Sequence, residues 1–241
     1  MQDVLGINWN LFEWLNAPAG HEPIVDRVMV FAANSLIFFA PLLLLALWFS
    51  FATVAPNWRY TAPAARASVA GDRALGQRLA LLALVAVPAA LALNIVLGHL
   101  IVEPRPFVSH PTVVHRLIAH AADASFPSDH EAVAAAIAAV LVIAALLIRR
   151  RERRIVPASP ATSARAYTWP GRLASVFAAL AVVIAAAIGL ARIYVGVHYP
   201  GDILGGALCG VIGALVALAL LRIAEPILAI VVGLAARLRL A

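Results

Sequence analysis

The sequence contains no lysine, because all 18 of its basic residues are arginine. This absence excludes Schiff-base chemistry, a P-loop and any other motif that needs an ammonium group. The single cysteine, Cys209, lies in an apolar run, so an internal disulfide, a CxxC redox pair and a cysteine-rich zinc site are excluded too. Only 12% of the 241 residues are charged, against about a quarter in ordinary soluble domains. These shortages argue against a typical cytosolic enzyme.

The sequence is instead rich in long hydrophobic stretches. Hydrophobic residues make up 63% of the chain, and the mean hydropathy is +0.94. A helix needs about 20 apolar residues to cross a bilayer. Five stretches without Asp, Glu or Arg are long enough: residues 28–58, 79–102, 132–148, 173–191 and 203–221. The first exceeds the need, and its helix is expected to end near Ser50. The sequence therefore predicts an all-α, polytopic bundle of five transmembrane helices in a single domain, residues 1–241.

Two further apolar segments are expected to form shorter helices. Residues 226–236 number only 11, which suits an interfacial or partly buried helix better than a sixth span. Residues 9–15 are rich in tryptophan and leucine and predict a short interfacial helix. The N-terminal region is not predicted to be a secretory signal, because it carries Asp3 and Glu13 and reaches its apolar run only after Arg27.

The arginines are distributed unequally between the loops that these spans define. Residues 51–78 and 149–172 hold most of them, including five arginines within 149–154. Residues 103–131 and 192–202, on the other side, hold only three arginines beside five carboxylates. The positive-inside rule makes residues 149–172 a cytoplasmic loop and turns the acid- and histidine-rich loops outward. No soluble basic domain carries the net charge of +6, so a nucleic-acid partner is not expected.

Three polar segments on the predicted outer side carry residue types suited to phosphate. In the first, residues 103–107, prolines fix the backbone on both sides of Arg105. A guanidinium held in this way can grip a phosphate with paired hydrogen bonds. The alternative is an arginine that only snorkels from a helix end towards water.

The second segment begins the third predicted span and contains Ser128 and His130. Ser128 and Glu131 fit a capping box, which is a sufficient structural reason for the serine. The free N–H groups and positive dipole end of a helix N-terminus also bind anions, and both roles can hold together. His130 is then expected in the first turn, beside whatever that terminus binds.

The third segment, residues 192–202, contains Arg192, His198 and Asp202. Pro200 is well placed as the first residue of the fifth helix. Asp202 then lies in the first turn, where it offsets the helix dipole and can also hold the His198 imidazole in one tautomer. Together the three segments offer two cations, an oriented imidazole as nucleophile and a second imidazole as proton donor. Metal-free phosphoryl transfer needs this combination.

These segments resemble the type 2 phosphatidic acid phosphatase (PAP2) family, with its lipid-phosphatase and vanadium haloperoxidase relatives. The family pattern is a lysine seven residues before Arg-Pro, then Pro-Ser-Gly-His, then Arg, five residues, His, three residues and Asp. In order within residues 79–221, the chain supplies Arg105-Pro106, Pro127-Ser128-Asp129-His130, and Arg192, His198 and Asp202. It departs from the pattern twice: Gly98, with His99 beside it, stands at the lysine position, and Asp129 replaces the glycine. A carboxylate beside a phosphate site is unfavourable unless it is turned away or neutralised.

The second and third segments and residues 15–24 look like the bacitracin-resistance-type branch, which dephosphorylates undecaprenyl diphosphate. The resemblance implies a multi-pass enzyme of the bacterial inner (plasma) membrane that recycles the peptidoglycan lipid carrier. It implies a polyprenyl diphosphate substrate among membrane lipids, an active site facing the periplasm, and no metal or other cofactor. It implies His198 as nucleophile, Asp202 as its orienter and His130 as general acid and base. The implied phosphate-binding residues are Arg105, Ser128, Asp129 and Arg192.

Other readings stay open beside this one. The first is a broader lipid phosphatase acting on phosphatidate or phosphatidylglycerophosphate, and the second is a transporter or ion-binding membrane protein, which the charge-free span interiors disfavour. A zinc hydrolase is not predicted, because Ala134 occupies the second histidine position of HExxH. Four outer-loop side chains are further candidates for contacting a second phosphate: His110, His115, Arg116 and His120.

Overall fold

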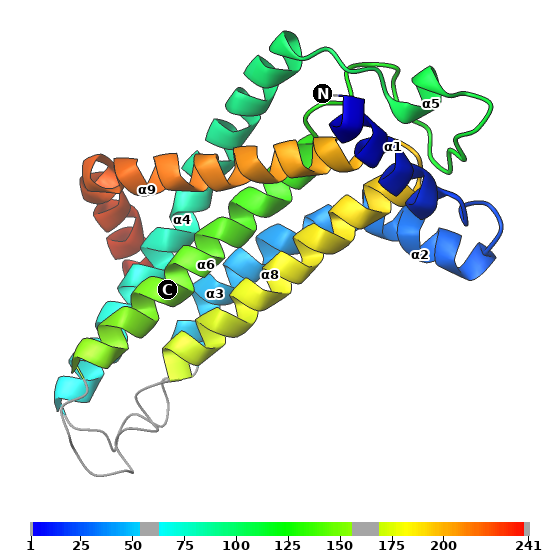
Figure 1. The fold of residues 1–241 in the computed structure, drawn as a ribbon. Helices are drawn as coiled ribbons and strands as arrows, with labels where there is room; N and C mark the ends of the chain where they lie inside the picture. The colour runs from blue at the N-terminus through cyan, green and yellow to red at the C-terminus, as the bar shows by residue number, and fades with distance from the viewer. Residues whose placement is uncertain (1, 54–62, 156–168, 239–241) are drawn as a thin grey trace.

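The structure, a computed structural model, describes residues 2–53, 63–155 and 169–238 (Figure 1). These residues are helical or in connecting loops, and their only strand-like feature is one isolated bridge between Pro104 and Ala124, as the predicted all-α class requires. The helices are α1 (Gln2–Asn16), α2 (Pro23–Asn34), η1 (Leu36–Phe38), α3 (Phe39–Thr53), α4 (Pro63–Leu100), α5 (Pro106–Ser109), α6 (Asp129–Ile155), α8 (Trp169–Tyr194) and α9 (Pro200–Arg237).

The predicted spans correspond to the long helices. Four described helices are long and apolar enough to cross a membrane: Leu75–Leu100, Asp129–Arg153, Gly171–Tyr194 and Pro200–Leu221. A fifth candidate is a pair bent by 46°, Pro23–Asn34 followed by Leu36–Phe49, which ends close to the expected Ser50. The chain is therefore a multi-pass membrane protein, with five spans when the bent pair is taken as one.

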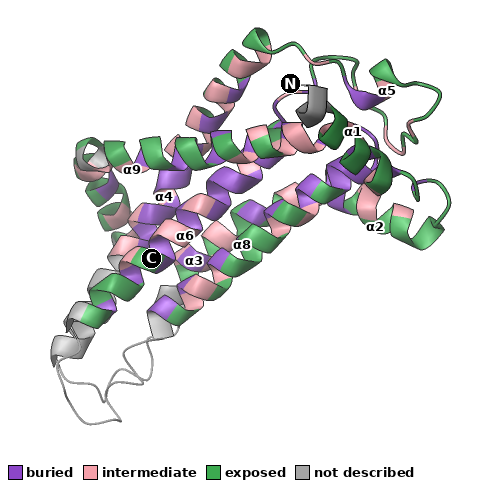
Figure 2. Ribbon diagram, in the orientation of Figure 1, coloured by how far each residue is buried: buried purple, intermediate pink, exposed green. Residues whose placement is uncertain are grey.

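Helix α6 is the centre of the bundle, with α4, α8 and α9 packed around it (Figure 2). Of its apolar window 67% is buried, against 33% in α8 and in α9. Alanine dominates its buried positions, and small side chains let helix backbones approach closely in lipid. At the contact with α9, a Cβ on Gly210 would lie 2.6 Å from backbone atoms of Ala132 and Ala136, so glycine is required there.

The C-terminal end of α9 contains the short apolar segment 226–236. Helix α9 continues past Pro226, and its segment Glu225–Ala235 is apolar but too short to cross a membrane. Figure 1 shows this end turned away from the line of the helix, as a proline within a helix commonly causes. An ion pair between Arg78 and Glu225 ties it to α4.

The two ends of the bundle differ in chemistry. At one end, α6 finishes in the exposed Arg149, Arg150 and Arg153, and buried Glu152 accepts a hydrogen bond of 2.8 Å from the N–H of Gly171 on α8. Parts of the predicted cytoplasmic regions, residues 54–62 and 156–168, lie outside the described residues. The three polar segments lie at the other end of α6, about 30 Å away for 20 helical residues.

Helix α1 covers this second end. It contains the short helix expected at 9–15, but it begins earlier and is not a candidate span. From α1, the side-chain oxygen of Asn8 accepts a hydrogen bond of 2.8 Å from the N–H of Gly201. Asn16 donates to the carbonyl of Tyr194 at 2.7 Å. Helix α1 thus braces the connection between α8 and α9.

Candidate active site

The turn between α8 and α9 carries His198 into the interior. Helix α9 begins at Pro200, as predicted. Gly196 has a φ of +82°, and a Cβ there would lie 2.7 Å from the carbonyl oxygen of His115, so no other residue fits this turn without strain. His198 is only 2% exposed, although it lies in a connecting segment.

Asp202 holds the His198 ring, as the four-residue spacing predicted. The Nδ1–H of His198 donates to Asp202 Oδ2 at 3.2 Å. The same oxygen accepts the backbone N–H of Tyr199 at 2.7 Å and the hydroxyl of Ser125. Asp202 is fully buried, so this arrangement fixes both the tautomer and the direction of the imidazole.

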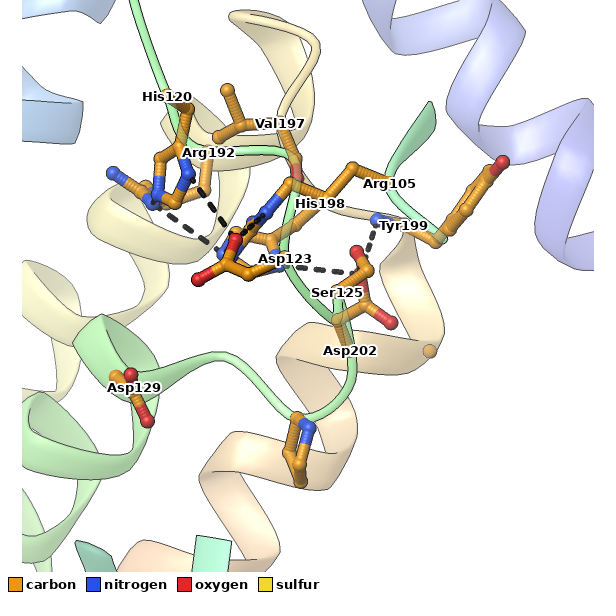
Figure 3. Close-up of polar contacts among 12 residues, drawn as sticks. Arg105, His120, Asp123, Ser125, Asp129, Arg192, Val197, His198, Tyr199 and Asp202 are labelled. Atoms are coloured by element: carbon orange, nitrogen blue, oxygen red, sulfur yellow. Dashed lines mark hydrogen bonds and ion pairs between the residues drawn. The ribbon is translucent and has the colours of Figure 1, made fainter. Parts of the chain in front are cut away.

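The other ring nitrogen of His198 faces two arginines (Figure 3). Its Nε2 lies 3.2 Å from Nη1 of Arg105 and 3.4 Å from Nη2 of Arg192. Because guanidinium nitrogens only donate hydrogen bonds, Nε2 must present its lone pair to them. Burial, followed by the charges of Arg192 and Arg105, lowers the pKa of His198 well below its usual range. The ring is therefore neutral at physiological pH, with an unprotonated nitrogen beside two guanidinium groups.

Arg105 is a buried site residue rather than a snorkelling one. It is 5% exposed and lies between the end of α4 and Pro106, the first residue of α5. Its Nη1 donates to the carbonyl of Val197 at 3.0 Å, and its Nε donates to Asp123 Oδ1 at 2.8 Å. The snorkelling alternative is therefore wrong.

Arg192, in the last turn of α8, is also buried. Its Nη2 donates to Nε2 of His120 at 2.9 Å, and its Nε has no hydrogen-bond partner among the described residues. Burial and the charge of Arg105 are the leading causes that lower the pKa of His120, so this ring accepts a hydrogen bond in its neutral form. The Nε–H of Arg192 is therefore left free to donate to an anion.

Of the four outer-loop side chains named as candidates for a second phosphate, only His120 reaches this cluster. The ring of His110 lies 4.1 Å from that of Trp9. His115 donates from Nδ1 to the carbonyl of Ala19 at 2.6 Å. The guanidinium of Arg116 lies 4.7 Å from the centre of the Phe107 ring. His110 and His115 therefore contact the N-terminal region, and Arg116 contacts α5.

The expected capping box at Ser128 does not form. Ser128 directly precedes α6, but its hydroxyl is buried without a hydrogen-bond partner in the described part of the chain, and so is Oε2 of Glu131. A contact with α9 decides this, because the N–H of Ser128 donates to the carbonyl of Asp202 at 3.1 Å and fixes the segment before the helix begins. The free hydroxyl and the first N–H groups of α6, which have no acceptor within the helix, remain for a ligand.

Asp129 accepts a hydrogen bond from a residue that the sequence analysis missed. Asn94 of α4 donates to Asp129 Oδ1 at 2.6 Å and to the carbonyl of Pro127 at 3.1 Å. In Figure 3 the Asp129 side chain lies apart from Arg105 and His198. Its carboxylate cannot donate to a phosphate, so the backbone N–H is the donor that this residue offers to an anion.

The lysine position of the family pattern has no cationic replacement among the described residues. A Cβ on Gly98 would lie 3.3 Å from the carbonyl oxygen of Phe126, so the position faces the second segment. His99 is exposed and donates from Nδ1 to the carbonyl of Ile95, one turn back, at 2.7 Å. A contribution of His99 to the site is therefore not supported.

His130 lies in the first turn of α6 and is half-buried. It is near enough to Arg192, His120 and Arg105 for their charges to act on it. Its position in the first turn of α6 is the one expected from the second segment.

Three further residues lie beside the site, and the sequence predicted no role for them. Ser125 and Asp123 lie in the loop before α6 and contact Asp202 and Arg105, respectively. Burial, followed by the charge of Asp202, raises the pKa of Glu103 to about 7. The only signal in the sequence was their closeness to Arg105 and Ser128, which does not predict a partner.

Comparison with known proteins agrees with this geometry. A model of the PAP2 superfamily matches residues 79–225. The chain is 32% identical over 209 residues to YbjG of Escherichia coli (strain K12), whose name places it among the undecaprenyl-diphosphatases; the match covers 87% of this chain and 80% of YbjG. It is 29% identical over 206 residues to the undecaprenyl-diphosphatase BcrC of Bacillus subtilis (strain 168), covering 86% of this chain and 80% of BcrC.

A solved structure is similar in fold. The crystal structure of Aquifex aeolicus LpxE has a TM-score of 0.52 and 23% sequence identity, with 88% of this chain and 95% of LpxE covered. At this identity the likeness concerns the arrangement of the helices.

Proposed function

Since the chain belongs to the PAP2 superfamily, we propose that it is a membrane phosphatase that hydrolyses undecaprenyl diphosphate to undecaprenyl phosphate and inorganic phosphate. The observation that carries the activity is the buried His198, held by Asp202 and facing Arg105 and Arg192 with an unprotonated Nε2. The names of the two relatives support the choice of substrate.

The first step transfers the terminal phosphoryl group to the enzyme. Nε2 of His198 attacks the terminal phosphorus, and the bond from phosphorus to the bridging oxygen breaks. That oxygen leaves with its electron pair on the lipid phosphate and takes a proton from His130. Asp202 stabilises the positive charge that develops on the His198 ring.

The two arginines act on the transferred group. Arg105 and Arg192 stabilise the charge on its equatorial oxygens, and Ser128 and the N-terminus of α6 supply further donors. The negative charge of the bound diphosphate favours the protonated form of His130, which the first step needs.

The second step releases phosphate. His130, now neutral, takes a proton from water, whose oxygen attacks the phosphohistidine as the phosphorus–nitrogen bond breaks. Each turnover consumes one water and restores both histidines. Efficient general acid and base catalysis of this kind contributes about 10²–10⁴-fold to a rate.

The distribution of arginines supports an outward-facing site in a bacterial plasma membrane, where such an enzyme would recycle the cell-wall lipid carrier. A cysteine at exposed Thr112, in a Cys209→Ser background, should react with an impermeant thiol reagent in intact cells. A cysteine at Ser159, in the loop expected to be cytoplasmic, should react only after lysis. The reverse pattern would overturn this orientation.

The substrate is tested by phosphate release from a panel of lipids in the same detergent at matched surface concentration. The panel contains undecaprenyl diphosphate, farnesyl diphosphate, phosphatidate and phosphatidylglycerophosphate. We expect the polyprenyl diphosphates to be cleaved with the highest kcat/KM. Faster cleavage of phosphatidate would instead make the protein a broader lipid phosphatase.

A further inference from the structure

His120 is a part of the site that the two proposed steps do not use. It lies in the loop between α5 and α6, and its Nε2 accepts a hydrogen bond of 2.9 Å from Nη2 of Arg192. The same Nη2 lies 3.4 Å from Nε2 of His198. The two imidazoles therefore flank one guanidinium nitrogen, with their ring centres 6.2 Å apart (Figure 3).

This arrangement brings His120 within reach of the phosphoryl group that His198 attacks. The phosphorus must come to about 3–3.5 Å from Nε2 of His198. An oxygen of that group that accepts a hydrogen bond from Nη2 of Arg192 then also faces Nε2 of His120. The contact is with the terminal phosphate, rather than with the second phosphate for which the sequence made His120 a candidate.

The hydrogen bonds of the His120 ring show where its proton lies before phosphate binds. Nδ1 lies 3.2 Å from the carbonyl oxygen of Ala121 and 3.8 Å from Oδ1 of Asp123. Both of these oxygens are acceptors, so Nδ1 carries the hydrogen and Nε2 presents its lone pair to Arg192. A phosphate oxygen at Nε2 needs a donor instead. The ring can contact phosphate in this way only by taking a second proton.

The surroundings of His120 favour that proton once an anion is bound. The charged and titratable side chains that act on the ring are Arg105, Asp123, His130, Arg192 and His198. Burial, followed by the charge of Arg105, lowers the pKa of His120; the charge of Arg192 lowers it too, whereas the Ala121 carbonyl and Asp123 raise it. A phosphate dianion between the two arginines offsets their charges and therefore raises the pKa of His120.

We propose that His120 is a third phosphate-binding residue, which takes up a proton at Nε2 when the phosphoryl group binds and donates a hydrogen bond to one of its oxygens. This inference rests on the proposed function. The transferred group spreads its charge over three equatorial oxygens. Arg105 and Arg192 are the two cations that contact His198 among the described residues, and the chain has no lysine to add another. The proton comes from solvent and returns there when phosphate leaves.

The probe is inorganic phosphate, the product of the proposed reaction. Its inhibition constant is measured at about pH 6 and about pH 8 on the purified full-length protein, with the lipid of the panel that is cleaved fastest as substrate. His120→Gln stays neutral at both pH values, and His120→Lys stays positively charged. The matched control is His99→Gln, because His99 is exposed and its ring is bonded to the carbonyl of Ile95 on its own helix.

We expect His120→Gln to weaken inhibition by at least about tenfold at pH 6, the scale of one charge-assisted hydrogen bond. Because the bound state holds the proton more tightly, the advantage of the parent should be present at low pH and shrink as the pH rises to 8. His120→Lys should bind phosphate more tightly than His120→Gln at both pH values, and His99→Gln should match the parent.

Four results would overturn the inference. Equal weakening of His120→Gln at both pH values would assign the ring a structural role, and unchanged inhibition would show that phosphate does not contact it. Tighter inhibition would show that His120 competes with phosphate for Arg192. The same loss in His99→Gln would show that the effect is not local to the site. A parent that prefers phosphatidate would contradict the proposed function alone, since the inhibition constant is measured with the preferred lipid.

Discussion

The two histidines of the candidate site lie in contrasting surroundings. His198 is held from both sides, with Asp202 at Nδ1 and the two arginines at Nε2, and it is almost completely buried. On the other side, the start of α6 has two buried polar atoms without a hydrogen-bond partner in the part of the chain that the structure describes, namely the hydroxyl of Ser128 and Oε2 of Glu131, and His130 is only half-buried.

This difference indicates which part of the site is complete before substrate binds. Orienting His198 in advance lowers the cost of reaching the transition state. A buried hydroxyl without a partner is unfavourable by about 1–3 kcal/mol, and a bound phosphate would relieve this cost. We therefore expect the third segment to be preorganised and the start of α6 to be completed by the substrate.

The largest effect should come from removing the preorganised nucleophile. His198→Ala should lose at least roughly 10³-fold in kcat, because no other imidazole among the described residues contacts both arginines. Steady-state phosphate release from undecaprenyl diphosphate measures this loss, and an unchanged melting temperature serves as the folding control. Near-normal turnover by this variant would contradict the role of His198.

His130→Gln should slow the reaction by about 10²–10³-fold, because the leaving lipid phosphate is no longer protonated. A substrate with a better leaving group, such as an aryl phosphate, needs less protonation, so its loss should be smaller. The two substrates are compared in the same assay. Equal losses for both would show that His130 acts otherwise than as general acid.

Substitutions of Ser128 and Ser125 distinguish the two sides of the site, namely the start of α6 and the surroundings of His198. Ser128→Ala removes a hydroxyl that has no hydrogen-bond partner among the described residues, so it should lower kcat/KM by about 10²-fold without lowering the melting temperature. Ser125→Ala removes a buried hydrogen bond to Asp202, so it should lower the free energy of unfolding by about 2 kcal/mol. The reverse pattern in thermal unfolding and kinetics would refute the contrast.

Replacing Asp123 should change the kinetics less. We expect its carboxylate to compete with inorganic phosphate for Arg105. Although burial acts in the opposite direction, the hydrogen bond and charge of Arg105 keep the pKa of Asp123 below its usual value. Asp123→Asn should tighten product inhibition by inorganic phosphate by about two- to fivefold, the worth of a partly exposed ion pair. Glu13→Gln, at an exposed position on α1, controls for the change in net charge. Weaker inhibition by inorganic phosphate in Asp123→Asn than in the parent would contradict the competition.

The smallest effect concerns Glu103, whose pKa is raised from 4.5 to about 7 by burial and then by Asp202. The folded protein holds this proton more tightly than the unfolded chain. The resulting stability is complete below pH 4.5 and is lost as the pH rises through about 7. Glu103→Gln cannot ionise, so its melting temperature should fall less than that of the parent from about pH 5 to about pH 8. Parallel curves for the two proteins would rule out this titration.

The sequence predicted the spans because apolar length is a local property of a chain. It also predicted the contact between His198 and Asp202, because Asp202 lies in the first turn of a helix that begins two residues after His198. The contacts of Asn94 with Asp129, Ser125 with Asp202 and Asn16 with Tyr194 could not be predicted. Each joins residues far apart in the sequence, and their pairing depends on how the helices pack.

The capping box failed for the same reason. Ser128 and Glu131 have the right spacing, but the hydrogen bond from Ser128 to the carbonyl of Asp202 sets the direction of the chain before the helix begins. A tertiary contact therefore overrode a local motif. The Ser128 hydroxyl, which has no hydrogen-bond partner among the described residues, is the group that we expect the substrate phosphate to complete.

The most direct test of the central role of His198 is to locate the transferred phosphoryl group. The purified protein is mixed with undecaprenyl diphosphate labelled in its terminal phosphate and quenched in alkali within a single turnover, and the labelled peptide is identified by mass spectrometry. We expect an acid-labile, alkali-stable label on His198, absent from His198→Ala and more abundant in His130→Gln if release of phosphate is slowed more than its transfer. Label on His130 instead, or equal labelling of His198→Ala, would contradict the assignment of His198 as the nucleophile.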